Sequence, residues 1–275
     1  MIPALLLLLA GLLPIPAMAA ERIVSLAPHL TELVFAIGAG DRLAGVSAFS
    51  DYPPEAKDLP RIGDARQIDI ERLLRLEPDL VLAWAEGTPE PLLDRLETLG
   101  LKVTRLPGSR FEDVPALARR LGELTGQVAE GEAVARQFEQ DLAAIRARHA
   151  DRPRLRGFYE LWPQPLMTVS PSHFIGQAMA FCGVDNIVPD TVTAPTPTWS
   201  EEDVIRARPE ILLTSPPAPD FARWRRWESL PAVRLEGLVV MPPDLLVRVG
   251  PRLIEGLEIL CARVEQVRAR RGDSK

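Results

Sequence analysis

Cysteine and histidine are scarce in this chain of 275 residues, which has two cysteines and three histidines. His29, His149 and His173 lie far apart in the sequence, whereas a zinc cage needs three or four converging ligands. The chain also lacks a glycine-rich phosphate loop, a nucleophile elbow and a His-Glu-x-x-His motif. The sequence therefore predicts no metal site, no catalytic residue and a protein that is not an enzyme. An exported α/β enzyme is the alternative from another class.

An excess of basic charge is absent as well. The formal net charge is -6, and acidic and basic residues are interleaved along the chain instead of forming blocks. A nucleic-acid surface needs a basic face. We therefore expect no nucleic-acid partner.

Long apolar runs are confined to the start of the chain. Residues 4–16 are almost entirely apolar and are followed by Ala17-Met18-Ala19, the small-x-small pattern after which signal peptidase cuts. No Lys or Arg precedes the run, and the run is too short to span a membrane comfortably. Residues 1–19 are predicted to be a signal peptide that is removed on secretion. The alternative is a buried N-terminal helix.

The two cysteines, Cys182 and Cys261, both lie outside this leader. An even number of cysteines in an exported chain favours a disulfide, and two cysteines leave one intramolecular pairing. The alternative is a pair of buried free thiols.

Two stretches of the chain match at one fixed offset, which aligns Glu71 with Glu202 and Pro78 with Pro209. Each reads as a short helix that opens with an acid, ends before a proline and leads into an apolar strand. A repeat of long period suggests two similar lobes. A chance match is the alternative, because helix, proline and strand often follow one another in α/β proteins.

Apolar strands alternate with helices on both sides of one long helical segment. This alternation predicts two doubly wound α/β lobes with parallel sheets, over residues 20–125 and 151–275. Residues 126–150 carry apolar residues at helical spacing with charges between them and are predicted to form the single helix that links the lobes. Because ligands bind beyond the C-terminal ends of parallel strands, we expect a ligand cleft between the lobes, near His29, Phe49 and Trp84.

Aromatic residues gather in the loops that follow strands. A cleft lined by such rings binds a large, flat or apolar ligand, whereas packing between lobes is the alternative for each ring. Trp224 and Trp227 are flanked by arginines and are expected on a surface helix. The loop aromatics are Phe49, Tyr52, Trp84, Trp162 and Trp199.

The chain resembles a known family over nearly all of its mature length. The stretches that carry it are Thr31-Glu32-Leu33, residues 45–54, residues 78–84, Cys182-Gly183, Asn186-Ile187, Asp244, Arg248-Val249, Pro251-Arg252 and Cys261. With these stretches the chain resembles the periplasmic cobalamin-binding proteins of bacterial ABC import systems, whose two α/β lobes are joined by a single helix. The resemblance implies a periplasmic monomer that captures cobalamin or a related corrinoid and needs no cofactor of its own.

The resemblance also implies roles for individual residues in the cleft. Phe49 would stack on the corrinoid, Trp84 would line the cleft, and Asp244 and Arg248 would face the ligand from the other lobe. The remaining residues expected to bind ligand are Tyr52, His29 and Trp199.

Glu71 and Glu202 match the two carboxylates, one per lobe, with which the family docks on arginines of the permease dimer in the inner membrane. Charge-assisted pairs at both ends of a rigid body fix its orientation. Each acid alone would also suit a helix N-terminus, and the neighbouring Glu201 is an alternative to Glu202. Cys182 and Cys261 match the disulfide of the family.

Three positions depart from the family pattern. Ala65 and Thr196 stand where aromatic residues are expected, with Trp199 as a nearby substitute for the second. His29 stands where a small residue is expected and could ligate cobalt or iron as a neutral imidazole. A precursor corrinoid, haem and a ferric siderophore are therefore the alternative ligands.

Overall fold

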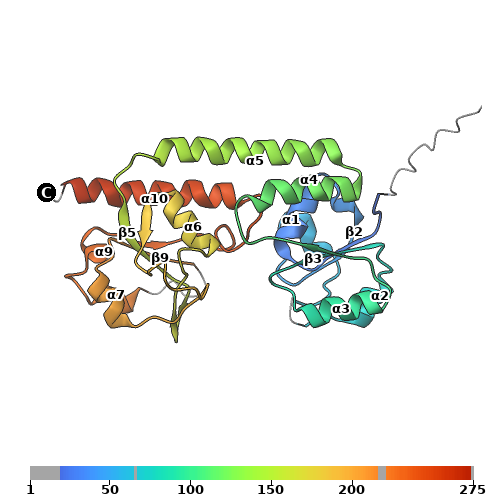
Figure 1. Ribbon diagram of the computed structural model, residues 1–275, viewed down its shortest axis with the longest axis horizontal. Helices are drawn as coiled ribbons and strands as arrows, with labels where there is room; N and C mark the ends of the chain where they lie inside the picture. Colours follow the sequence, from blue (N-terminus) through green and yellow to red (C-terminus); the bar gives the residue numbers. More distant parts are fainter. Residues whose placement is uncertain (1–18, 65–66, 216–220, 274–275) are drawn as a thin grey trace, which may run out of the picture.

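The computed structural model describes residues 19–64, 67–215 and 221–273. Two α/β lobes lie side by side, and a long helix, α5 (Val128–His149), runs from one to the other along the same side of both (Figure 1). The fold class predicted from the sequence is thereby confirmed. The expected signal peptide, apart from Ala19, and Ala65 lie outside the described residues. None of the helices in the described ranges is long and apolar enough to cross a membrane.

The N-terminal lobe is a parallel sheet of four strands in the order β2-β1-β3-β4, covered by helices. Short 3-10 helices follow the first helix and precede the second. The elements are β1 (Ile23–Ser25), α1 (Pro28–Ala36), η1 (Gly40–Arg42), β2 (Leu43–Val46), η2 (Pro54–Asp58), α2 (Ile70–Arg75), β3 (Leu80–Trp84), α3 (Glu90–Thr98), β4 (Val103–Leu106) and α4 (Asp113–Thr125).

The C-terminal lobe repeats this topology. Its parallel sheet has the order β8-β5-β9-β10, so that each strand has a counterpart at the same place in the first sheet. The elements are β5 (Leu155–Glu160), the antiparallel pair β6 (Trp162–Pro163) and β7 (Leu166–Met167), α6 (Phe174–Phe181), β8 (Val184–Asn186), α7 (Glu201–Ala207), β9 (Ile211–Thr214), α8 (Ala222–Arg225), α9 (Pro231–Arg234), β10 (Leu238–Val240) and α10 (Leu253–Asp273).

The repeated sequence forms the same unit in both lobes, namely α2 with β3 and α7 with β9. Asp69 caps α2 by accepting a hydrogen bond from a backbone N–H three residues on, at 2.9 Å. Ser200 caps α7 in the same way at 3.0 Å. Glu71 and Glu202 are each the second residue of their helix. The repeat in the sequence is therefore a repeat in the structure.

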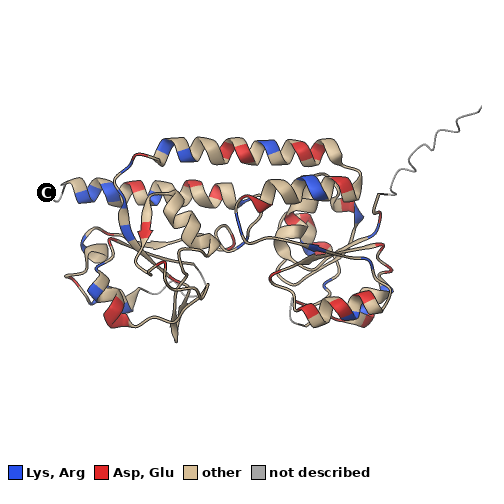
Figure 2. Ribbon diagram, viewed as in Figure 1, with Lys and Arg blue, Asp and Glu red and all other residues tan. Residues whose placement is uncertain are grey.

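Ion pairs fasten α5 to both lobes. In the N-terminal half of α5 and at its middle, Glu132 and Glu139 accept hydrogen bonds from Arg119 of α4 at 2.7 and 2.8 Å. At its end, the Nδ1 atom of His149 lies 2.9 Å from a carboxylate oxygen of Glu265 on α10. Figure 2 shows the alternation of basic and acidic residues along α5 and α10. The linking helix is thus held as a rigid strut.

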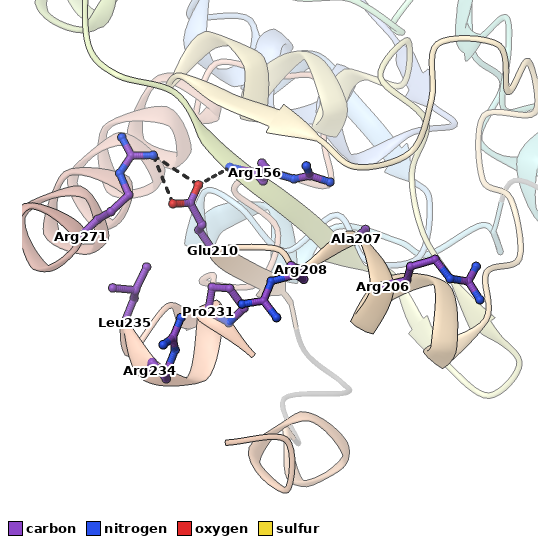
Figure 3. Close-up of a pocket in the computed structure, with 9 residues that line it drawn as sticks. All are labelled: Arg156, Arg206, Ala207, Arg208, Glu210, Pro231, Arg234, Leu235 and Arg271. Atoms are coloured by element: carbon purple, nitrogen blue, oxygen red, sulfur yellow. Dashed lines mark hydrogen bonds and ion pairs between the residues drawn. The ribbon is translucent and has the colours of Figure 1, made fainter. Parts of the chain in front are cut away.

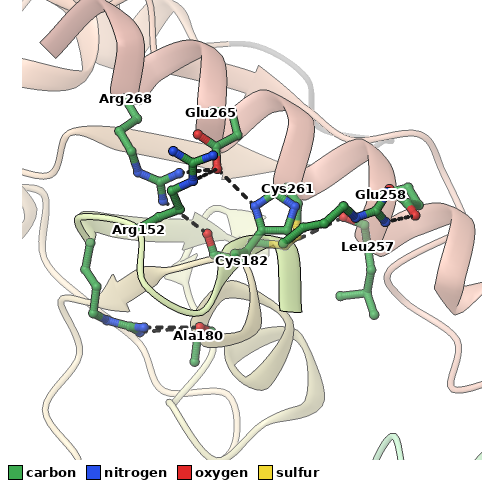
Figure 4. The surroundings of a disulfide bond; sticks show 11 residues. Arg152, Ala180, Cys182, Leu257, Glu258, Cys261, Glu265 and Arg268 are labelled. Carbon is green, nitrogen blue, oxygen red and sulfur yellow. Dashed lines mark hydrogen bonds and ion pairs between the residues drawn. A yellow bond between two sulfur atoms is a disulfide. The ribbon is translucent and has the colours of Figure 1, made fainter. Parts of the chain in front are cut away.

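The predicted disulfide between Cys182 and Cys261 is confirmed, and both cysteines are buried (Figure 4). It joins the end of α6 to the middle of α10, with 4.7 Å between the Cα atoms. The bond closes a loop of 79 residues, which contributes about 4 kcal/mol of stability on the chain-entropy model. It holds the last helix against its own lobe.

The expectation that Trp224 lies on a surface is wrong. Its side chain is 0% exposed, packs edge-on against Phe158, and donates a hydrogen bond from Nε1 to Glu160 at 2.6 Å. The short helix α8 directs this one ring into the lobe, whereas the neighbouring arginine side chains remain at the protein surface. Trp227 is exposed, as expected.

Candidate functional site

A cleft lies between the lobes at the C-terminal ends of the strands. The cleft holds about 310 Å³ and is open to solvent. Five of the seven residues predicted to bind ligand line it together: His29, Phe49, Trp84, Asp244 and Arg248. The other lining residues are Pro28, Gly108, Phe174, Val247 and Val249.

Phe49 and Asp244, one from each lobe, have left-handed backbone conformations, with φ of 64° and 70°. This region is unusual for residues other than glycine, and for a bulky aromatic residue in particular. Backbone strain of this kind concentrates at binding sites. Phe49 is also 72% exposed, so the strained loop presents a bare ring to the cleft.

His29 and Trp84 form the floor of the cleft. Their rings meet edge to face, with 5.4 Å between centroids and 88° between planes. His29 lies in the first turn of α1 and is buried, and burial together with the charge of Arg248 lowers its pKa to about 4. Its imidazole is therefore neutral at neutral pH. His29 Nε2 and Trp84 Nε1 are buried with no hydrogen-bond partner in the described ranges, although buried polar groups normally have one.

Two glycines that sequence reasoning missed leave room for these rings. A Cβ atom on Gly87 would lie 1.9 Å from the Trp84 ring. A Cβ atom on Gly108 would lie 2.9 Å from His29 Nε2 and 3.2 Å from Trp84 Nε1. Both glycines follow strand ends, but no pattern in the sequence distinguishes them from other loop glycines.

Arg248 is the hub of the charged wall of the cleft. It lies 2.8 Å from a carboxylate oxygen of Asp244 and 3.1 Å from one of Asp51. Partial burial opposes a fall in the pKa of Asp51, but the hydrogen bond and charge of Arg248 outweigh it and hold that pKa below its ordinary value. Arg248 and Asp244 thus form one polar surface on the C-terminal lobe.

Helices α2 and α7, which carry the two predicted docking acids, lie on the side of the molecule opposite α5 (Figure 1). The side chain of Glu71 is 89% exposed, and its one ion pair, to Arg75, is long at 3.9 Å. Glu202 is exposed and has no ion pair with any residue that the structure describes. Glu201, by contrast, accepts hydrogen bonds from Arg226 and, at 3.0 Å, from Trp227 Nε1. Of the two adjacent acids, Glu202 is the one free to pair with a partner.

Residues 23–245 match the family model described as periplasmic binding protein. The chain belongs to this family. The vitamin B12-binding protein of Vibrio parahaemolyticus is 35% identical over 253 residues, which cover 91% of this chain and 92% of that protein. Its counterpart from Pectobacterium atrosepticum is 33% identical over 259 residues, with 90% of each chain covered.

Solved structures agree with this membership. The periplasmic vitamin B12 binding protein BtuF of Vibrio cholerae superposes with a TM-score of 0.82 at 33% identity, covering 90% of this chain and 98% of that one. The periplasmic heme-binding protein RhuT from Roseiflexus superposes with a TM-score of 0.79 at 26% identity, covering 90% and 100%. Members of the family are periplasmic substrate-binding proteins, and the haem-binding members are the more distant relatives of this chain.

The remaining two residues predicted to bind ligand are not among those that line the cleft. Tyr52 is partly exposed beside it, and the guanidinium of Arg252 lies 4.1 Å from the centroid of its ring. Trp199 packs against a core cluster of the C-terminal lobe. Its backbone N–H donates to Leu166 at 2.9 Å. The roles predicted for these two family positions stay predictions.

A larger hollow of about 570 Å³ lies at the N-terminal ends of strands β5 and β9, whereas the cleft lies at the C-terminal strand ends (Figure 3). Arginines dominate its lining, and Glu210 ties its walls together (Figure 3). The Glu210 carboxylate lies 3.2 Å from Arg271 and accepts a hydrogen bond from the backbone N–H of Arg156 at 3.0 Å. This hollow shares no residue with the cleft.

The described ranges also contain no group of three or more His, Cys, Asp and Glu that could hold a metal ion.

Proposed function

We propose that this protein captures vitamin B12, or a closely related corrinoid, in the periplasm and delivers it to an ABC transporter. The observation that carries the proposal is the cleft itself, in a chain whose relatives at about a third identity, matched over nine tenths of its length, are vitamin B12-binding proteins.

The cleft offers two kinds of contact to such a ligand. Phe49 and Trp84 present aromatic surface from the N-terminal lobe, which suits a broad ring system. Asp244 and Arg248 present acceptors and donors from the C-terminal lobe, which suit the amide groups at a ring's edge. A corrinoid is larger than this cleft volume, so its outer part would rest on the exposed ring of Phe49.

Delivery would use the exposed carboxylates of Glu71 and Glu202. Helices α2 and α7, which carry them, lie on the same side of the two lobes (Figure 1), so both acids can pair with arginines of one permease dimer. In this proposal residues 1–19 are removed as a signal peptide, and residues 20–125 and 151–275 are the lobes that residues 126–150 link. The mature protein acts as a monomer and carries out no catalysis.

Haem is the second candidate ligand, because a buried neutral imidazole in the floor of the cleft suits an iron or cobalt atom. Ligation by His29 would give the bound metal a characteristic absorption spectrum. The change His29→Ala should then alter the spectrum of the complex, and an unchanged spectrum would exclude ligation.

A competition titration tests the choice between the two ligands. The mature protein is titrated with haemin and with cyanocobalamin, and each complex is followed by absorbance. We expect cyanocobalamin to displace haemin at comparable concentrations. Tight binding of haemin that excess cyanocobalamin does not reverse would overturn the proposal.

A further inference from the structure

A cluster of buried charges joins the two lobes behind the cleft. Glu32 of α1 has a side chain that is 2% exposed. Arg252, which precedes α10 in the other lobe, binds it through two parallel hydrogen bonds of 2.9 and 2.6 Å. Arg248 adds a third hydrogen bond at 3.2 Å. We name Glu32, Arg248 and Arg252 the interlobe clamp.

The clamp is the ionic connection between the lobes. Among the described residues, each ion pair that runs directly from one lobe to the other involves Arg248 or Arg252. The backbone also comes close at this point, because a Cβ atom on Gly250 would lie 3.3 Å from the Cβ of His29. Away from this contact, the lobes are joined by α5 (Figure 1) and meet edge to face at the rings of Phe111 and Phe181, with 6.0 Å between centroids.

The geometry of the clamp favours a single lobe arrangement. A fork of two parallel hydrogen bonds between a guanidinium and a carboxylate fixes direction as well as distance. Removal of one partner from a buried pair leaves the other charge without compensation, which is strongly unfavourable. Water replaces these bonds poorly at a site where the Arg248 side chain is only 11% exposed.

The clamp also acts on the cleft, because Arg248 belongs to both. One nitrogen of Arg248 binds Glu32 and Asp51 of the N-terminal lobe, and the other binds Asp244, which lines the cleft. Arg248 is therefore already oriented before a ligand arrives. A site whose groups are fixed in advance loses less entropy on binding.

We propose that Glu32 is a positioning residue of the capture cleft: its buried carboxylate fixes the angle between the lobes and holds Arg248 in the geometry that receives the ligand. Nothing in this role requires Glu32 to touch the ligand. The inference rests on the proposed function for its link to affinity, whereas the fixed angle is a property of the ligand-free protein.

The test measures the distance between the lobes directly. Nitroxide labels are placed at Lys102→Cys and Glu228→Cys, two exposed positions on different lobes, in a chain whose native cysteines are both in the disulfide. Pulsed electron resonance on the ligand-free protein then gives the distance distribution. We expect a narrow distribution for the parent and a broad one for Glu32→Gln, together with a loss of cyanocobalamin affinity of roughly 10-fold or more.

Two further variants make the test specific. Glu258→Gln removes a carboxylate from an exposed pair with Arg148 between α5 and α10, and should change neither readout. Arg252→Lys keeps the positive charge but loses the two parallel hydrogen bonds. Like Glu32→Gln, it should give a broad distance distribution and weaker cyanocobalamin binding, and it takes the place of Glu32→Gln if that variant does not fold.

A narrow distribution in the clamp variants would overturn the proposal whatever the affinity. A broad distribution with unchanged affinity would overturn the link to the cleft. If the parent does not bind cyanocobalamin at all, the proposed function has failed, and the distance distribution still decides whether Glu32 fixes the lobes.

Discussion

The ring of His29 meets the ring of Trp84 at 88°, with 5.4 Å between centroids, in the floor of the cleft. The contact holds a titratable group against an aromatic wall, out of water. Stability and ligand binding are therefore both expected to depend on this pair.

The stability of the protein should fall in mild acid. The pKa of His29 is lowered from 6.5 to about 4, by burial first and by the charge of Arg248 second, and burial lowers the pKa of His173 to about 4 as well. Between these pH values the unfolded chain binds protons that the folded protein does not, so the free energy of unfolding decreases as the pH falls. His29 alone should account for up to about 3 kcal/mol.

Urea unfolding at several pH values between 4 and 7 measures this effect. The variant His29→Gln should give a flatter dependence on pH than the parent, and the further change His173→Gln should flatten it again. Curves that stay parallel for parent and variants would show that neither histidine resists protonation in the folded state.

The two cleft rings should supply binding energy. Phe49→Ala and Trp84→Ala should each weaken cyanocobalamin binding by about 1 to 3 kcal/mol, because each removes an aromatic surface from the ligand. Leu99→Ala removes an exposed apolar side chain at the end of α3 and serves as the control. Fluorescence titration gives the affinities, and unchanged affinity in both ring variants would mean that the rings only pack the protein.

Gly87 should be needed to place Trp84. In Gly87→Ala the added methyl group would overlap the ring at 1.9 Å, so the ring must move, and affinity should fall by roughly 10-fold. Gly272→Ala is the matched control, because nothing lies within 4 Å of a Cβ atom there. Equal affinities for the two alanine variants would show that the position of Trp84 does not matter for binding.

Docking and capture should separate by mutation. The double change Glu71→Ala with Glu202→Ala should weaken binding to the transporter and leave cyanocobalamin affinity nearly intact, because both acids lie outside the cleft. Glu201→Gln tests the neighbouring acid, which is already paired with Arg226 and Trp227. Surface plasmon resonance with the reconstituted transporter measures how strongly the double variant and Glu201→Gln each dock, relative to the parent protein. Loss of docking with Glu201→Gln alone would assign the role to that residue.

Local patterns in the sequence were enough to predict much of the fold. The spacing of apolar residues over short segments of the sequence predicts the strand before His29, the strand that ends at Trp84, and the long helix α5. The disulfide followed from a count, because two cysteines allow one pairing. The repeat predicted a second lobe, and the matching strand orders confirm it.

Contacts between distant residues could not be predicted in the same way. Glu32 lies 220 residues from Arg252 in the sequence, and nothing in either segment indicates that they pair. Trp224 is buried because a short helix turns its ring inward, although its neighbours are charged. The crowding around Gly87 depends on where the Trp84 ring lies, which is decided by tertiary packing.

Binding of one vitamin B12 molecule between the two lobes is the main expectation of the proposed function. Calorimetric titration of the mature protein with cyanocobalamin tests it most directly, with Trp84→Ala in parallel. We expect a saturable signal with one ligand per chain at micromolar protein, and weaker binding in the variant. No heat from the parent protein, or equal binding by parent and variant, would contradict the account.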